Sequence, residues 1–350
     1  MIEKYYSGVI EQIYNRIGKE TRNIVMANYS NDFSIENLEV IRRYQSNEDN
    51  VFFAYSEFSY NTLVGAYEPF LDIICNMHRR FIGGSFDDFQ KECGVYYLHR
   101  QVLNSYYETG ECFREETVLL NEVAYEQRRM TMAIADMLKK LSEVKPLMIV
   151  INRFQMASKS SIETIKYLID NPCANIGIVL GVNAIVKGTD STVEVWDRIV
   201  ESLEDRSAIY YIGSAGPLKN NVKTTNDDEL YITMNFEQSI QEASNIMEFL
   251  DFEQARRGCR IIEHKLKFED AWIDEKSLRR FYMVYARTSV LLGEMSKAIE
   301  LTNEYKALIP ENDSEHYLSL YYFMKGTCYM YQGKLEKAGN SAKRDRKSVV

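Results

Sequence analysis

The sequence lacks paired cysteines, long apolar runs and an excess of basic residues, and each absence excludes a class of protein. Its six cysteines are scattered without a C-x-x-C pair, a pattern typical of reduced thiols packed as small hydrophobic side chains. No apolar stretch approaches the roughly 20 residues that cross a bilayer, and Glu3 and Lys4 interrupt any signal peptide at the N-terminus. The net charge of −9 argues against a nucleic-acid clamp in this region. We therefore expect a cytoplasmic chain with no membrane partner.

The first part of the chain alternates short apolar runs with helical patterns. Five strands are predicted in chain order, over residues 23–27, 51–55, 147–151, 175–182 and 208–212. Helices are predicted over residues 1–18, 35–44, 68–81, 87–108, 116–141, 160–170 and 192–203, the sixth beginning with a Ser160-x-x-Glu163 capping box. Strands that alternate with helices predict an α/β fold, a parallel sheet with helices on both faces.

A change of composition marks the predicted domain boundary. Turn residues gather over residues 213–228, and the sequence from Phe236 onward has only helical periodicity. At 350 residues the chain is long enough for two cores. We predict an α/β domain over residues 1–215, a linker over 216–235 and an all-α region over 236–344.

The all-α region contains an internal repeat. Small residues recur at spacings of seven and five in two sets, Ala286, Gly293, Ala298 and Gly326, Gly333, Ala338. Small side chains at these points let two antiparallel helices approach closely, and glycine ends the first helix of each pair. The pattern resembles tetratricopeptide repeats. Gly258 marks a possible earlier, degenerate unit. An ordinary helical bundle is the alternative.

The last six residues, 345–350, have a separate explanation. Their sequence, Asp-Arg-Lys-Ser-Val-Val, matches one reading frame of a common sequencing adapter. We expect this tail to be an artefact and the natural protein to continue beyond it. An ordinary polar tail is the alternative.

The strand at residues 147–151 is followed by Asn152 and Arg153, where chemistry is expected in a nucleotide-binding fold. In ATP-hydrolysing P-loop proteins such a strand ends in acidic residues that hold magnesium and position the attacking water. Here an amide and a guanidinium follow the strand, and no G-x-x-x-x-G-K-[ST] loop occurs in the sequence. His99, His264 and His316 also lack the spacing of metal ligands. We therefore predict no catalytic residues, no metal site and no resident cofactor.

Taken in order, these segments resemble the nucleotide-binding region of STAND-class signalling ATPases, a group related to the AAA proteins. The strand at 23–27 and its following turn occupy the phosphate-loop position, residues 51–55 with Tyr67-Glu-Pro-Phe70 resemble the second strand and its entry motif, and residues 147–153 correspond to the Walker B strand. The resemblance implies a P-loop NTPase-like sheet followed by tetratricopeptide-like helices. It also implies a degenerate nucleotide site at Ser30, Asn31, Asn152, Arg153 and Asn183.

The resulting hypothesis is a non-catalytic sensing or scaffolding region of a larger bacterial signalling regulator. Protein or peptide partners would bind the helical repeats, and DNA would be bound only through a missing C-terminal domain. The first alternative is a nucleotide switch that binds ATP through a non-standard loop, with Arg153 contacting phosphate. The second is an adaptor whose repeat groove binds a peptide through Tyr317, Tyr321 and Tyr329.

Overall fold

A computed structural model describes most of the chain. The described residues are 2–30, 38–46, 50–59, 63–114, 118, 120–184, 192–215, 236–268, 273–310 and 314–348. The predicted linker over residues 216–235 lies outside them. The chain divides into an α/β unit within residues 1–113 and 127–231, and a helical unit within residues 232–350 that also takes in residues 114–126.

The α/β unit is built on a parallel sheet with the strand order β2-β3-β4-β1-β5. The strands are β1 (Ile24–Tyr29), β2 (Phe52–Glu57), β3 (Leu147–Asn152), β4 (Ile176–Asn183) and β5 (Ile209–Ile212). The predicted α/β fold is thus confirmed. The first four strands end one or two residues later than their apolar runs predict, and these extra residues are mostly polar.

The burial of each strand follows its place in the sheet. Every residue of β3 and β4 is buried, while β5, at one edge, is largely half-buried or exposed. A central parallel strand is covered on both faces, which is why its sequence is a continuous apolar run rather than an alternation.

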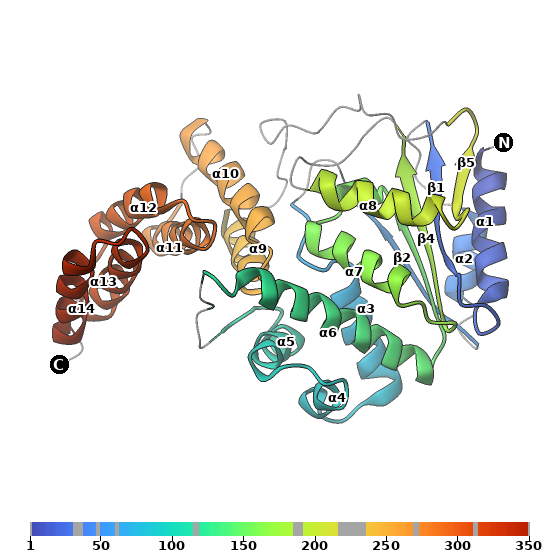
Figure 1. Cartoon of the computed structure of the whole chain (residues 1–350), viewed down its shortest axis with the longest axis horizontal. Coiled ribbons are helices and arrows are strands. Elements are labelled where there is room, and N and C mark those ends of the chain that lie inside the picture. The colour runs from blue at the N-terminus through green and yellow to red at the C-terminus, as the bar shows by residue number, and fades with distance from the viewer. Residues whose placement is uncertain are drawn as a thin grey trace. The chain divides into compact units, whose positions relative to one another are not determined.

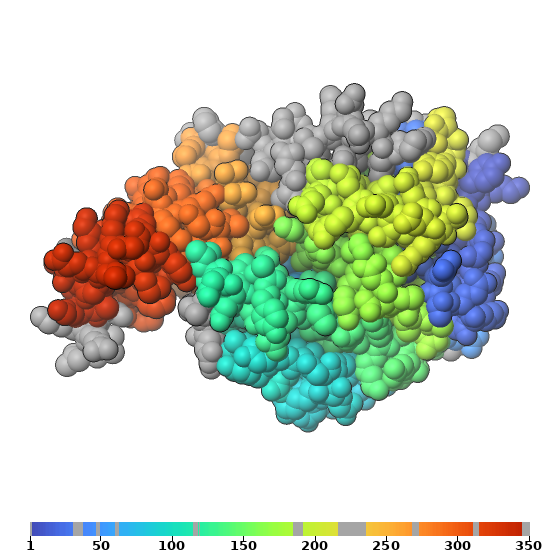
Figure 2. Space-filling view, in the orientation of Figure 1, coloured from blue at the N-terminus to red at the C-terminus, as the bar shows by residue number. Residues whose placement is uncertain are grey.

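Helices cover both faces of the sheet, as the direction of the crossovers requires. The connection from β1 to β2 runs to the far edge through α2 (Glu39–Ser46), whereas the later connections run back the other way. Because crossovers between parallel strands are right-handed, the two directions place helices on opposite faces. α1 (Ile2–Arg16) and α2 share one core with the sheet. α7 (Lys159–Asp170) and α8 (Val193–Glu204) lie on the other face (Figure 1) and hide the strands in the space-filling view (Figure 2).

The segment between β2 and β3 is helical throughout most of its described length. It contains α3 (Phe70–Met77), a π-helical turn (His78–Ile82), α4 (Phe86–Glu92), α5 (Tyr97–Thr109) and α6 (Val123–Val144). The single helix predicted over residues 87–108 is wrong. Gly94, with a φ of 71°, turns the chain between α4 and α5, a conformation that glycine adopts without steric cost.

The start of α7 also differs from the prediction. The predicted cap Ser160 lies inside the helix, and Ser158 is the N-cap, whose hydroxyl accepts a hydrogen bond from the Ser161 amide. A short 3₁₀ turn at Phe154–Met156 precedes it. Both serines fit the cap chemistry, so the backbone path out of β3 decides which of them caps the helix.

The helical unit consists of consecutive antiparallel pairs. Its helices are α9 (Phe236–Glu248), α10 (Phe252–Phe268), α11 (Glu275–Leu291), α12 (Met295–Ala307), α13 (Ser314–Tyr331) and α14 (Leu335–Ser348) (Figure 1). Gly293 and Gly333 have φ of 78° and 72° at the turns of the last two pairs, which confirms the turn role predicted for them. A β-carbon placed on Gly326 would lie 3.4 Å from Ser341 Cβ, so α13 and α14 approach closely at this glycine.

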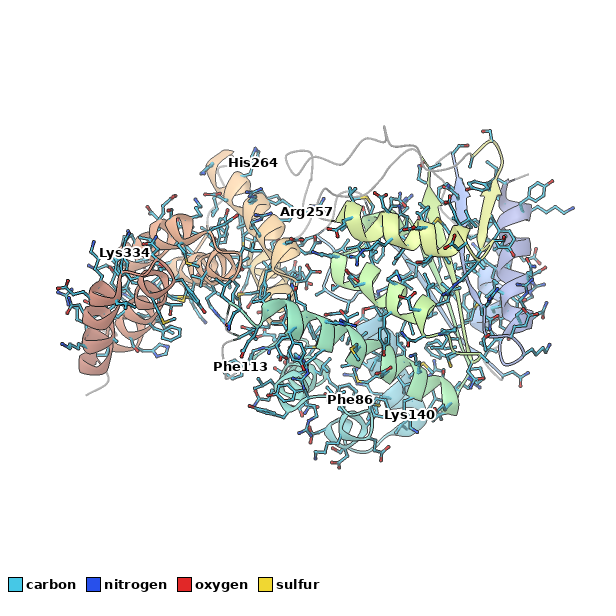
Figure 3. All side chains as sticks on the ribbon, in the orientation of Figure 1. Phe86, Phe113, Lys140, Arg257, His264 and Lys334 are labelled. Atoms are coloured by element: carbon cyan, nitrogen blue, oxygen red, sulfur yellow. The ribbon has the colours of Figure 1, made fainter. Side chains whose placement is uncertain are left out.

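The first helical pair uses a different residue at its turn. Leu250, with a φ of 69°, occupies the left-handed position between α9 and α10. Gly258, considered as the mark of an earlier repeat, instead lies inside α10, between the positions of Arg257 and His264 that Figure 3 labels on that helix. The repeat signal fails in this pair because a leucine takes the conformation in which glycine is expected.

His78 forms a buried aromatic cluster in the α/β unit. Its ring lies 5.0 Å from Phe86, 5.2 Å from Phe89 and 5.4 Å from Tyr107, measured between centroids. Its Nδ1 is 3.1 Å from the Tyr107 hydroxyl. Burial, and then the charge of Arg79, lower the pKa of His78 below its usual value.

This lowered pKa predicts acid-sensitive stability. Below about pH 6.5 the unfolded chain binds a proton at His78 that the folded chain refuses, so the free energy of unfolding should fall as the pH drops toward the folded pKa. We expect His78→Phe to lose less stability than the wild type between about pH 7.5 and about pH 5.5, measured by urea unfolding. His316→Gln, at an exposed histidine, should keep the wild-type slope. Equal slopes for His78→Phe and wild type would contradict the assignment.

Among the described residues, no helix is both long and apolar enough to cross a membrane.

Candidate functional site

The carboxyl edge of the sheet, at β1 and β4, is where this topology places a binding site. These strands are neighbours, but the chain leaves β1 toward one face of the sheet and leaves β4 toward the other. In open α/β sheets, ligands bind outside the carboxyl ends of the strands at such a switch point. The arrowheads of both strands end at this edge in Figure 1.

Polar side chains from three strands meet at this edge. The Tyr29 hydroxyl, at the end of β1, donates a hydrogen bond of 2.8 Å to Asn152 Oδ1, at the end of β3. Asn152 Nδ2 in turn donates to Glu57 Oε1, at the end of β2, over 3.1 Å. Tyr29 and Asn152 are fully buried. We call Tyr29, Tyr55, Glu57, Asn152 and Arg153 the carboxyl-edge network.

Glu57 is the centre of this network. Its Oε1 also forms an ion pair of 2.8 Å with the Arg153 guanidinium, and its Oε2 accepts a hydrogen bond from the Tyr55 hydroxyl. Arg153 donates as well to the Phe58 carbonyl at 3.3 Å. The Glu57 and Arg153 side chains are 15% and 20% exposed, so the pair is shielded but reaches solvent. One carboxylate therefore satisfies an amide, a guanidinium and a phenol together.

The floor of the network, formed by Gly181 and Tyr6 beneath Asn152, has no space for an added atom. A β-carbon added to Gly181 of β4 would lie 2.3 Å from the Tyr6 hydroxyl and 2.7 Å from Asn152 Oδ1. The Tyr6 ring meets the Tyr29 ring edge-on, with centroids 6.4 Å apart. Burial, reinforced by Tyr29 and other acidic neighbours, raises the pKa of Tyr6 well above its usual value, so its phenol stays neutral.

The sequence-predicted site residues are only partly brought together. Asn152 and Arg153 meet at Glu57. Ser30, just beyond β1, pairs instead with the Ser214 hydroxyl at 3.2 Å. The backbone amide of Asn183 donates to Gln155 Oε1 at 3.3 Å. Asn31 lies outside the described residues, as do the rest of the turn predicted after the first strand and the first three residues of the helix predicted over 35–44.

Glu57 and Tyr29 were not predicted from the sequence. Each lies two residues beyond the end of a predicted strand, where the apolar run has already stopped. Glu57 is in register with Asn152, and Tyr29 with Asn183. The alternation Phe53, Tyr55, Glu57 was the available signal, because alternate residues of a strand share a face.

The chemistry of the network is that of a closed cluster. The positive charge of Arg153 is compensated by Glu57, and both polar ends of the Asn152 amide are hydrogen-bonded. Arg153 itself has a φ of 53°, a left-handed conformation that non-glycine residues seldom adopt and that concentrates at functional sites. In the part of the chain that the structure describes, no group of three His, Cys, Asp or Glu residues could hold a metal ion.

The three tyrosines predicted for partner binding all lie on α13, in different surroundings. Tyr321 is 3% exposed, with its hydroxyl accepting from Lys325 Nζ at 2.6 Å. Tyr317 and Tyr329 are half-buried under cations, Arg279 at 5.1 Å and Lys337 at 5.8 Å from the ring centroids. Tyr321 therefore packs inside the helical unit. Three apolar side chains that were not predicted from the sequence are exposed on α13 and α14 instead: Phe323, Met330 and Leu335.

Comparison with protein-family models, with curated proteins and with solved structures finds no match to this chain.

Proposed function

We propose that this chain is a non-catalytic sensing or scaffolding region of a signalling regulator, with a STAND-like α/β domain that has lost ATP hydrolysis. The observation that carries the proposal is the bond set of Glu57. It joins Asn152 and Arg153, the two residues at the position of the Walker B acids, into a cluster satisfied by the chain's own side chains. Hydrolysis needs groups that hold magnesium and orient water, and here the Asn152 amide and the Arg153 guanidinium are both bonded to Glu57 instead.

The helical unit supports a role in protein binding. Its antiparallel pairs with left-handed glycines at Gly293 and Gly333 are compatible with tetratricopeptide-like repeats. Phe323, Met330 and Leu335 are 46%, 47% and 70% exposed. Phe323 and Met330 are seven residues apart on α13, a spacing that places them on one face of the helix, and exposed apolar side chains that share a face favour contact with a protein or peptide. The same observation favours the adaptor alternative, in which peptide binding is the whole function.

A nucleotide-binding switch is the second candidate, and the conformation of Arg153 favours it. Its left-handed backbone is a strained feature placed at the carboxyl edge. If a phosphate replaced Glu57 as the partner of this guanidinium, binding would open the carboxyl-edge network without any hydrolysis.

Nucleotide binding separates these proposals. For the full chain we expect no thermal stabilisation by ATP or ADP with magnesium at about 5 mM. A nucleotide that did bind, at about 100 times its Kd, would raise the free energy of unfolding by about 2.7 kcal/mol, which is easily detected. Calorimetry under the same conditions should show no saturable heat. Glu57→Gln removes the carboxylate of the Arg153 ion pair and is the variant in which we expect weak binding first.

A clear shift in the wild-type chain would contradict the proposal and support the switch, provided that Arg153→Ala abolishes it. Arg198→Ala is the matched control, because Arg198 also pairs with a carboxylate, Glu163 at 2.9 Å, but on the surface of α7 and α8. It should leave any nucleotide binding unchanged.

A further inference from the structure

A cleft of about 180 Å³ opens at the amino ends of β1 and β5, the opposite edge of the sheet from the carboxyl-edge network. It lies wholly inside the α/β unit, and its walls come from the ends of α1, α7 and α8 and the starts of the two strands. A cavity of about 150 Å³ accommodates benzene. The cleft therefore has room for one small organic molecule.

Two arginines of this cleft have no carboxylate within ion-pair distance among the residues that the structure describes. Arg206 donates to the Ile169 carbonyl, which is neutral, and Arg22 is exposed; within the described ranges neither has an acidic partner. A third, Arg16, is paired with Glu20 at 3.6 Å. Guanidinium groups bind carboxylates through paired hydrogen bonds. In a chain with a net charge of −9, this local excess favours a ligand with an anionic group.

The cleft also contains a buried acceptor that needs a donor. Asn23 is fully buried, and its Nδ2 donates both to the Glu20 carbonyl and, over 3.1 Å, to the Ala174 carbonyl. These two acceptors decide which way the amide is turned. Its Oδ1 is then left buried with no hydrogen-bond partner in the described structure. A buried acceptor of this kind is satisfied by an N–H or O–H group that enters the cleft.

The electrostatic potential of the surrounding helices favours a ligand that also carries a cationic group. α1, α7 and α8 all end at this edge of the sheet, and each helix C-terminus carries a partial negative charge. The walls between these polar groups are apolar, with Leu168, Pro172 and Leu203 among the lining residues.

From this combination we propose that the cleft binds an α-amino acid with an apolar side chain. Its carboxylate would be held by Arg22 and Arg206, its ammonium would satisfy Asn23 Oδ1, and its side chain would lie against the apolar wall. Such a zwitterion complements both the positive arginines and the negative helix C-termini of the cleft, whereas a simple anion complements only the arginines. The site is separate from the carboxyl-edge network, so this inference goes beyond the function proposed above and does not depend on it.

The test is calorimetric titration of the full chain with L-leucine and with two ligands that each lack one charged group. These are 4-methylpentanoic acid, without the ammonium, and isopentylamine, without the carboxylate. We expect saturable binding of leucine at concentrations up to about 5 mM and at least about tenfold weaker binding of both truncated ligands. L-Phenylalanine tests whether a larger apolar side chain also fits.

Arg22→Gln should weaken leucine binding about tenfold or more, the loss expected for one charge-assisted contact. Because Arg22 is exposed, we expect the Arg22→Gln variant to fold, and urea unfolding verifies this. Arg280→Gln, at an exposed arginine of α11, is the matched control and should bind as the wild type does. Arg153→Ala should also leave binding intact, which keeps this test distinct from that of the carboxyl edge.

Three results would overturn the inference. One is no saturable heat with leucine or phenylalanine. Another is equal affinity for leucine and either truncated ligand. The third is leucine binding that Arg22→Gln leaves unchanged. In each case the arginines of the cleft would serve only to stabilise helix C-termini.

Discussion

Replacing Glu248 by glutamine should lower the free energy of unfolding of the helical unit by about 3–5 kcal/mol, the loss typical of a buried ion pair that loses one partner. Glu248 Oε1 pairs with Arg287 at 2.8 Å, and its Oε2 lies 3.9 Å from Arg114 Nε. The Glu248 and Arg114 side chains are 7% and 2% exposed. Glutamine keeps the volume but removes the negative charge that faces the buried Arg114 guanidinium and pairs with Arg287.

The measurement is urea unfolding of the wild type and of Glu248→Gln, followed by circular dichroism. Glu275→Gln is the matched control on α11, because Glu275 also pairs with an arginine, Arg279 at 3.6 Å, but is 77% exposed. Its effect should stay within about 0.5 kcal/mol, as for most surface pairs. Similar losses for the two variants would show that Glu248 has no special role in the helical unit.

Replacing Gly181 by alanine should lower the free energy of unfolding of the α/β unit by about 3 kcal/mol, the upper end of the range for overpacking. The added β-carbon would lie 2.3 Å from the Tyr6 hydroxyl and 2.7 Å from Asn152 Oδ1. The Tyr6 ring is fully buried against Tyr29, so it has little freedom to withdraw. The clash should also disturb the hydrogen bond between Tyr29 and Asn152.

Gly8→Ala is the control for Gly181→Ala. Gly8 lies inside α1, and nothing is within 4 Å of a β-carbon placed there. Alanine has the higher helix propensity, so this variant should be more stable by up to about 1 kcal/mol. Opposite signs for the two glycines are the expected result in urea unfolding. A neutral Gly181→Ala would mean that the floor of the carboxyl-edge network relaxes easily.

The second prediction concerns the site on which the proposed non-catalytic role rests. In the carboxyl-edge network, Glu57, Asn152 and Arg153 satisfy one another, so removing one member costs stability because it breaks the bonds of the others, of which Asn152 is fully buried. A nucleotide would have to compete with these bonds. A binding test is therefore a sharper measure of function at this edge than an ATPase assay.

The fold class could be predicted because it depends on local pattern. The apolar runs that became β3 and β4 are continuous, as central parallel strands require, and the alternation with helices allowed only parallel crossovers. Gly293 and Gly333 were correctly placed at turns for the same reason, since their conformation is a property of the residue itself.

The errors have equally local causes. Residues 87–108 read as one helix because the periodicity continues across Gly94, whose left-handed φ divides α4 from α5. The N-cap of α7 was placed on Ser160 rather than Ser158 because several serines there have the same cap chemistry. At the turn between α9 and α10, Leu250 takes a conformation that its side chain disfavours, so no glycine signal was present.

The sequence by itself determined the α/β class, the approximate strands, the turn glycines of the last two helical pairs and the amide and guanidinium at the end of β3. Only the tertiary structure decided that Glu57 joins Asn152 to Arg153, that Gly181 must lack a side chain, and that Asn23 is buried with an open acceptor. The physical reason is the sequence separation of the residues that interact. Helices and buried strands follow from neighbours along the chain, whereas each of these sites depends on strand register and packing between residues far apart in sequence.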